Sequence, residues 1–310
     1  MTERTPLRRS AEYWAVLAGI MTVSICFYGI RAAAVYALAA VTAVAVDLVC
    51  LFLRRRHYRA VNLTGIASAL VLVMMLPATV PFSVVVLSVL VSVALGMHLF
   101  GGRHDLLFPP AALGYLFARI CWPQEVLRFP EPGEKIALFR HTAVLDDSLS
   151  RTFLTTGSIH ESLTDVLIGA VRGPMGTGFI LLLAVALVIL MLRGGVNLFA
   201  VPGYFMGATA VCLRFGLDTL QMTAVCMSLF TVLFLASDPA VMPCTGIYAL
   251  VGGGLTGALS VTLSVTYTLE YAPVIAVILT CPVWRALAML EQYLYTPPEE
   301  TQEEVQAHDA

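Results

Sequence analysis

Long apolar runs dominate the chain, and short stretches between them carry most of its charges. Ten runs are apolar enough to enter a membrane, and they lie near 12–30, 32–53, 61–77, 79–99, 109–122, 176–193, 196–215, 219–236, 246–267 and 271–292. A hydrocarbon core about 30 Å thick needs roughly 20 apolar residues per helical crossing, so the fifth run is too short to cross unaided. Because the runs are continuously apolar and do not alternate, they predict helices and not barrel strands.

Two polar interruptions in these runs share one spacing. Asp238 − Asp105 = 133 and Tyr248 − Tyr115 = 133, and prolines follow both aspartates. A recurring spacing suggests a duplicated unit. With about five helices in each copy the second copy enters the membrane from the opposite side, which makes an inverted repeat. We therefore expect an all-α integral membrane protein with about ten transmembrane helices in two inverted repeats, whose discontinuous helices meet at the repeat interface.

The polar stretches divide this architecture into four parts. Residues 1–122 form the first five-helix repeat, 123–172 an extracytoplasmic loop segment, 173–293 the second repeat, and 294–310 an acidic cytoplasmic tail that we expect to be disordered. Arginines gather before the first run and after the second, so the positive-inside rule places both termini in the cytoplasm. The first run is too long for a signal-peptide core and predicts a retained anchor.

Composition supports a membrane protein. The 310 residues are 59% hydrophobic and only 12% charged, whereas a water-soluble domain is about 25% charged. We therefore expect a multi-pass protein whose surroundings are the lipid bilayer, and no nucleic-acid partner. The seven cysteines show no Cys-x-x-Cys and no ligand spacing with histidine, so no metal site is predicted within the chain.

The interruption at Asp238-Pro239 has the form of a helix N-cap followed by proline at the first helical position. It either starts the ninth helix and no more, or leaves helix-start amides that bind an anionic or polar ligand group. A short loop could solvate Asp105 with its basic neighbours. Gly101-Gly102 would let a backbone or a flat ligand approach closely.

Three other polar features lie within or beside the runs. Asp47 stands alone in the second run and must face protein or water. Glu270 and Arg285 lie near the ends of the last run and could snorkel to the interface. Gly253 and Gly257 have the spacing of a helix-packing motif, although a cofactor would explain them about as well.

Several motifs resemble one family when they are taken in order. These are Asn62-Leu-Thr-Gly65, Leu99-Phe-Gly-Gly102, Phe108-Pro-Pro-Ala-Ala-Leu-Gly-Tyr115 and Phe234-Leu-Ala-Ser-Asp-Pro239. Together they resemble the D-type membrane component (RnfD) of Rnf-type electron-transport complexes, which is related to the B-type component of the Na⁺-translocating NADH:quinone reductase. The likeness runs over roughly residues 60–290 and implies a ten-helix fold with inverted repeats in a bacterial inner membrane.

The family resemblance also implies a cofactor. Its members carry FMN esterified to a threonine in a motif of the form Asp-x-x-Ser-Gly-Ala-Thr. The corresponding stretch here is similar to it, Asp146-Asp-Ser-Leu-Ser-Arg-Thr152, which keeps the separation of Asp146 and Thr152 but replaces the inner Ser-Gly-Ala. Thr152 is the implied acceptor, and flavin held without a covalent bond is the alternative.

The resulting hypothesis is a membrane subunit that relays electrons through FMN or a related flavin, within a membrane oxidoreductase complex of translocase type. Its partners would be other membrane subunits of an electron-transport complex and a flavin-carrying subunit. Asp238, Pro239, Asp105, Gly101 and Gly102 would hold the cofactor, whose ring supplies the redox chemistry. Two alternatives stay open: a small-solute transporter or channel with inverted repeats, and a cofactor-free scaffold subunit.

Overall fold

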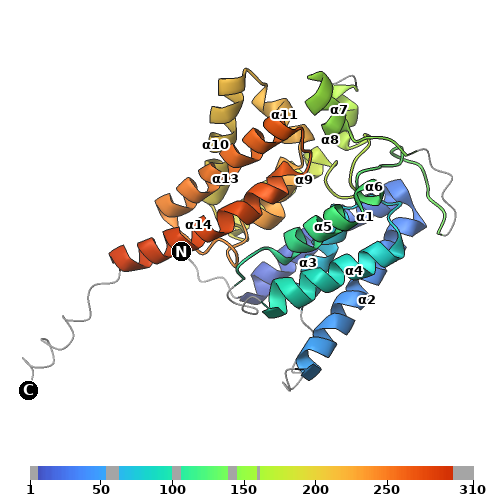
Figure 1. Cartoon of the computed structure of the whole chain (residues 1–310), viewed down its shortest axis with the longest axis horizontal. Helices are drawn as coiled ribbons and strands as arrows, with labels where there is room; N and C mark the ends of the chain where they lie inside the picture. The colour runs from blue at the N-terminus through green and yellow to red at the C-terminus, as the bar shows by residue number, and fades with distance from the viewer. Residues whose placement is uncertain (1–5, 54–62, 100–105, 139–144, 159–160, 296–310) are drawn as a thin grey trace, which may run out of the picture.

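The computed structural model describes residues 6–53, 63–99, 106–138, 145–158 and 161–295. Helices make up almost all of its regular structure (Figure 1). In the first part of the chain they are α1 (Pro6–Tyr28), α2 (Ile30–Leu53), α3 (Leu63–Met74), α4 (Phe82–Val93), η1 (Ala94–Leu99), α5 (Pro110–Cys121) and α6 (Pro123–Val126). Then follow α7 (Leu149–Thr156), α8 (Leu163–Ile168), α9 (Ile180–Arg193), α10 (Ala200–Phe215), α11 (Thr219–Val225), α12 (Ser228–Thr231), η2 (Val232–Ala236), α13 (Gly246–Tyr267) and α14 (Ala272–Tyr295).

The protein has several helices long and apolar enough to cross a membrane. Among the described residues five qualify: Ala11–Tyr28, Ile30–Leu53, Phe82–Leu99, Gly246–Tyr267 and Ala272–Leu294. A sixth crossing results if α10 and α11, which meet at a bend of 119°, count as one. All ten predicted runs contain helix, but α3, α5 and α9 are shorter. The multi-pass, all-helical prediction is confirmed, and the count of ten crossings stays a prediction.

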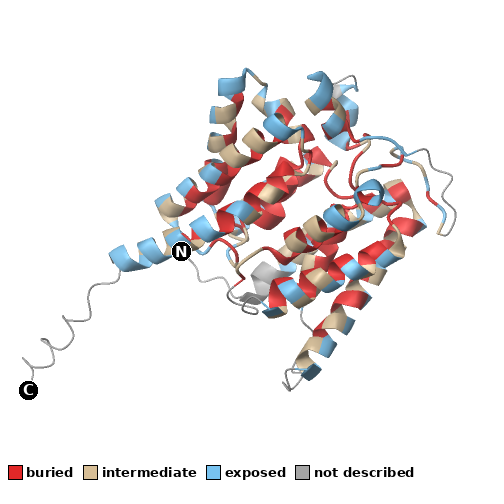
Figure 2. Ribbon diagram, in the orientation of Figure 1, coloured by how far each residue is buried: buried red, intermediate tan, exposed pale blue. Residues whose placement is uncertain are grey.

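The helices form two groups that meet along one junction. Figure 1 shows α1–α6 on one side and α10, α13 and α14 on the other, with α7 and α8 together at one end. Contacts between α5 and α14 join the two groups, and α9 packs against α1 of the first group. Figure 2 shows that the buried residues face this interior, while α7, α8 and the outer faces of the long helices are more exposed.

Glycines bring α10 and α13 into backbone contact, the most extensive helix pairing in the described chain. A Cβ on Gly207 would overlap the carbonyl oxygen of Gly254, and one on Gly257 would overlap that of Tyr204. Gly253 likewise lies against the Ala200 carbonyl, so contacts advance together along both helices and the two run parallel. The Gly253/Gly257 spacing therefore serves helix packing, the first of its two readings.

The short helix α3 ends inside the protein, where other segments satisfy its backbone. A helix of 12 residues is only about 18 Å long, well short of the hydrocarbon thickness. The amides of Gly176 and Met175 donate to the carbonyls of Met74 and Leu76 at 2.8 and 3.1 Å. The buried guanidinium of Arg31 donates to three carbonyls of the following turn and to that of Leu138. Irregular backbone is tolerated at this depth because protein groups replace the missing water.

A further break divides the predicted run 219–236. Helix α11 ends at Val225, and Met227 has a left-handed backbone with φ of 52° before α12 begins. A non-glycine residue in this region is uncommon and marks a constrained turn. The apolar pattern does not reveal the break, because Val225, Cys226 and Met227 at the break are themselves apolar and buried.

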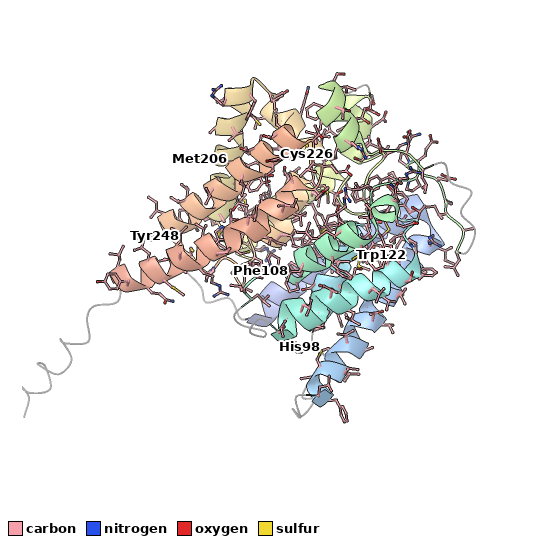
Figure 3. All side chains as sticks on the ribbon, viewed as in Figure 1. His98, Phe108, Trp122, Met206, Cys226 and Tyr248 are labelled. Atoms are coloured by element: carbon pink, nitrogen blue, oxygen red, sulfur yellow. The ribbon has the colours of Figure 1, made fainter. Side chains whose placement is uncertain are left out.

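Asp47 faces protein, one of the two environments that the sequence allows. Its side chain is nearly buried on α2, and Oδ1 lies 2.8 Å from Nε2 of His98 on η1. Figure 3 labels His98 at the end of the α4–η1 helix. A carboxylate in an apolar helix needs such a partner, because an unpaired charge there is costly.

Candidate functional site

Asp238 begins a tight turn and not a helix. Its Oδ1 accepts the amide of Ala240 at 2.9 Å, and its carbonyl accepts the amides of Val241 and Met242. Helix α13 begins only at Gly246, so the prediction that Asp238-Pro239 caps the ninth helix is wrong. A helix starting at Pro239 would place the ring of Pro243 against the Pro239 carbonyl four residues earlier, which stops it within one turn.

The true start of α13 already has an anionic partner. The amide of Thr245 donates to Oε2 of Glu291 at 2.9 Å, and the Thr245 hydroxyl donates to Oε1 of the same side chain. A carboxylate at a helix N-terminus satisfies an orphan amide and complements the helix dipole. At this helix start the Thr245 amide is therefore already paired with a side chain of α14.

Asp238 instead borders a cavity, here called the Asp238 pocket. The pocket has a volume of about 230 Å³ and lies between the start of α1, the start of α3, the 195–196 turn and the end of η2. Its walls include Tyr13 and Trp14 from α1, and the Tyr13 ring packs edge-on against Phe234 with centroids 5.7 Å apart. The half-buried carboxylate of Asp238 is the charged group on a wall otherwise made of aromatic, aliphatic and hydroxyl-bearing side chains.

The described parts of both polar interruptions meet on one stretch of α14. Nη2 of Arg285 donates to the Leu106 carbonyl at 2.7 Å, next to the first interruption. The Cys244 thiol, at the second, lies 3.1 Å from the carbonyl of Trp284. Asn197 then donates from Nδ2 to the Cys244 carbonyl at 2.7 Å. Arg285 thus serves an internal contact, and the two interruptions converge on consecutive residues of one helix.

Thr152 and Asp146 lie on the segment that contains α7. Thr152 is half-buried on α7, and its hydroxyl donates to the Ser148 carbonyl at 3.2 Å. Asp146 is exposed, pairs through its backbone with Phe129, and accepts Arg172 at 2.6 Å. The sequence predicted a loop here. The structure has a helix because Ser148 caps it by accepting the Arg151 amide and Gly157 ends it with a left-handed backbone.

The structure does not bring Thr152 and Asp238 together. Tyr13 borders the Asp238 pocket, whereas the carbonyl of Tyr28, at the other end of α1, accepts Ile136 of the 123–172 segment. Fifteen helical residues between them correspond to about 22 Å. The α12–η2 helix separates the same two places, since Ser150 of α7 donates to Val225 before it and Asp238 follows it. One flavin would therefore occupy one of these places.

A second buried carboxylate lies at the α7 end. Glu270 is only 5% exposed, and its Oε2 accepts the hydroxyl of Ser148. Arg119 lies nearby with its guanidinium carbon 4.8 Å from the centre of the Tyr271 ring. We call Ser148, Glu270, Arg119 and Tyr271 the α7 cluster. The prediction that Glu270 snorkels to the interface is wrong, because the α7 segment covers the short turn between α13 and α14.

Sequence reasoning missed the α7 cluster because its partners are 122 positions apart. The available signal was a glutamate in a turn of four residues between two long apolar runs. A turn this short does not guarantee that the glutamate reaches solvent. Figure 3 places Cys226, beside this cluster, at the α7 end of the molecule and Tyr248 at the opposite end of α13.

Three predicted cofactor residues, Gly101, Gly102 and Asp105, lie outside the described residues. Within the described chain, no group of three histidine, cysteine or acidic side chains is placed to hold a metal ion. Phe108, just after the first interruption, lies near the junction of the two helix groups in Figure 3.

The long apolar helices and the internally satisfied breaks define a multi-pass membrane protein. A family model described as NQR2, RnfD, RnfE family matches residues 3–289. The chain therefore belongs to this family, as its motifs indicated.

Curated relatives support the assignment at modest identity. The chain is similar to the D component of the ion-translocating oxidoreductase complex of Haemophilus ducreyi, with 28% identity over 140 residues, 44% of this chain and 40% of that protein. It is 30% identical over 139 residues to the protein of the same name from Pseudomonas aeruginosa, again 44% and 40%. For Pseudomonas paraeruginosa the identity is 32% over 132 residues, 42% and 38%. The matched region spans about 40% of the length of these relatives.

Proposed function

We propose that this chain is a membrane subunit of an electron-transfer complex in a bacterial inner membrane and relays electrons through a bound flavin. The observation that carries the proposal is the family match over residues 3–289, together with relatives named as the D component of an ion-translocating oxidoreductase complex. The proposal includes ten crossings in two inverted repeats, both termini in the cytoplasm, and partner subunits that deliver and remove electrons, one of them carrying flavin.

The Asp238 pocket fits the ring of a flavin better than its phosphate. Pockets that enclose a whole drug-sized ligand measure about 300–1,000 Å³, and this one measures about 230 Å³. Its aromatic wall suits a flat ring, and the Asp238 carboxylate can accept a ring N–H but would repel a phosphate. When bound, the flavin supplies the redox chemistry. Tyr13, Trp14 and Phe234 would exclude water, and Asp238 would orient the ring, with Pro239 fixing the turn that presents it.

Thr152 is the other place for the cofactor. An ester on its oxygen would replace the hydroxyl hydrogen that now bonds to the Ser148 carbonyl. The half-buried position and the exposed Arg151 beside it leave the outer face of α7 open. The resemblance supports this site, and the cavity supports the Asp238 pocket. We choose the Asp238 pocket and leave the ester as an outcome of the test.

The test is an absorption spectrum of this chain purified from native membranes and freed of its flavin-carrying partner subunit, and the intact mass of the chain before and after denaturation. We expect flavin that is released on denaturation, that is diminished in Asp238→Leu, and that is retained in Thr152→Val and in the control Thr155→Val on the same helix. Flavin that remains on the denatured chain and is lost only in Thr152→Val moves the site to α7. A chain that holds no flavin once that partner is removed would overturn the relay.

A further inference from the structure

Glu270 is a buried acid that serves neither proposed flavin site. It occupies the turn between α13 and α14, outside both helices, and the segment before α7 closes over it. The Ser148 hydroxyl that donates to its Oε2 also accepts the Arg151 amide as the cap of α7. The carboxyl group is therefore fixed in place by a protein segment distant in sequence.

Several charged or titratable groups surround this carboxyl. Asp147 and Arg151 face it from the α7 segment, Arg119 and Tyr115 from α5, and Cys226 from the end of α11. Within the part of the chain that the structure describes, none of the arginines forms an ion pair with Glu270; Arg151 pairs with Asp147 instead. The two arginines therefore act on the carboxyl group through their charge, although neither forms an ion pair with it.

Two buried polar atoms of the cluster lack partners. Among the described residues, Oε1 of Glu270 and Nε of Arg119 accept or donate no hydrogen bond. An unsatisfied buried acceptor and an unsatisfied buried donor each cost free energy, so such atoms need an explanation beyond packing. One acceptor oxygen already suffices to hold the Ser148 hydroxyl, which leaves Oε1 for another role.

The environment sets the proton affinity of this acid. Burial disfavours the charged carboxylate and raises the pKa of Glu270 to about 7, against the lowering effects of the Ser148 hydrogen bond and the Arg151 and Arg119 charges. Asp147 raises it slightly further. A carboxyl group with this pKa changes its protonation state near neutral pH.

We propose that the α7 cluster is a proton-binding site in which Glu270 takes up a proton on Oε1 and releases it to water at the α7 end. Uptake forms one O–H bond and changes the carboxyl charge from −1 to 0, with water as the proton's source and no change of oxidation state. Arg151 and Thr155 are exposed on α7, so solvent lies on the outer side of the segment that covers this acid. The site exists whether or not a flavin is bound, so it goes beyond the proposed function.

The test is infrared difference spectroscopy of the full chain in lipid nanodiscs during a pH titration. We expect a protonated-carboxyl band that disappears with a midpoint near pH 7, is absent in Glu270→Gln, and is kept in Glu291→Gln. Glu291 is a matched control because it is also a carboxylate bound to a hydroxyl, at the other end of α13. A band with a midpoint in the ordinary glutamate range of about 4 to 5, or one unchanged by Glu270→Gln, overturns the proposal.

Arg119→Met is a second variant, for the case in which Glu270→Gln does not fold. Arg119→Met removes a positive charge that favours the carboxylate, so the midpoint should move to higher pH; an unchanged midpoint or a lower one argues against the site. The titration is also run with Na⁺ replaced by choline. A band that depends on Na⁺ at constant pH identifies the bound ion as a metal cation and overturns proton binding.

Discussion

The two ends of the molecule each hold a carboxylate in a largely apolar setting, but they hold it differently. At one end Asp238 is bound by the Ala240 amide, two residues along the same turn. At the other end Glu270 is bound by Ser148, a residue 122 positions away. The first arrangement leaves the carboxylate beside a cavity, and the second buries it with one oxygen unpaired.

The comparison shows that a local contact and a long-range contact suit different tasks. A carboxylate held by its own turn keeps its place when neighbouring helices shift, which suits a ligand site. A carboxylate covered by a distant segment loses water and changes its proton affinity, which suits a proton site. Variants at each end test whether Asp238 and Glu270 differ in this way.

The largest effect on the free energy of unfolding is expected from a change in the α10–α13 pair, which links the two ends. Gly207→Leu would force α10 and α13 apart, because even a Cβ there overlaps the Gly254 carbonyl. We expect a loss of about 3 kcal/mol or more, the upper part of the range for overpacking, with both ends disrupted. Thermal unfolding in detergent measures it. Gly19→Ala is the control, since a Cβ there meets no atom within 4 Å, and it should be neutral or stabilising.

The next largest effect is a dependence of stability on pH, which we expect from Glu270 at the α7 end. The folded pKa of Glu270, about 7, lies above that of an unfolded glutamate, so the native state binds the extra proton. Stability of the wild type should therefore fall as pH rises from about 4.5 to about 7, by about 3 kcal/mol. Glu270→Gln should lose this slope. Unfolding midpoints of both proteins across this range measure the difference, and equal slopes would contradict the prediction.

A smaller effect is expected at the Asp238 end. Glu291→Ala removes the cap on α13 and should cost about 1 kcal/mol, the usual value of an N-cap interaction. Hydrogen exchange at the first turn of α13 should increase while exchange in α7 stays unchanged. Increased exchange in α7 as well would show that the two ends are not independent.

The smallest effect on stability is expected for Asp238→Asn. Asparagine keeps an oxygen that can accept the Ala240 amide, so the turn should persist with a change within about 0.5 kcal/mol. Flavin content should nevertheless fall, because an amide is a weaker acceptor for a ring N–H than a carboxylate. A large loss of stability without loss of flavin would assign Asp238 to the fold and not to the pocket.

The sequence predicted some of these features and not others. It placed helix in every apolar run and identified the short fifth run. It required protein or water around Asp47, and His98 provides a protein partner. It misplaced the start of α13, because a cap and a proline are a valid local signal that Pro243 then cancels. It missed the break at Met227, since Val225, Cys226 and Met227 are themselves apolar.

For the candidate sites too, the sequence showed some features and only the structure showed the others. The motif around Asp238 was visible in the sequence, and the structure adds the aromatic cavity beside it. Thr152 and Asp238 were both assigned to one cofactor, but the Asp238 pocket and the contact of residues 123–172 with α1 lie about 22 Å apart along that helix. Glu270 was expected at the interface, but only the path of the 123–172 segment decides whether it meets water.

By itself the sequence determined that the chain is a helical membrane protein of a recognisable family, because the need to satisfy every backbone group in lipid leaves long apolar runs little choice but helix. The tertiary structure alone decided which polar groups meet. Glycine contacts between α10 and α13, the cap from Glu291 and the cover over Glu270 join residues far apart in the chain, and hydrophobic periodicity carries no information about such pairs.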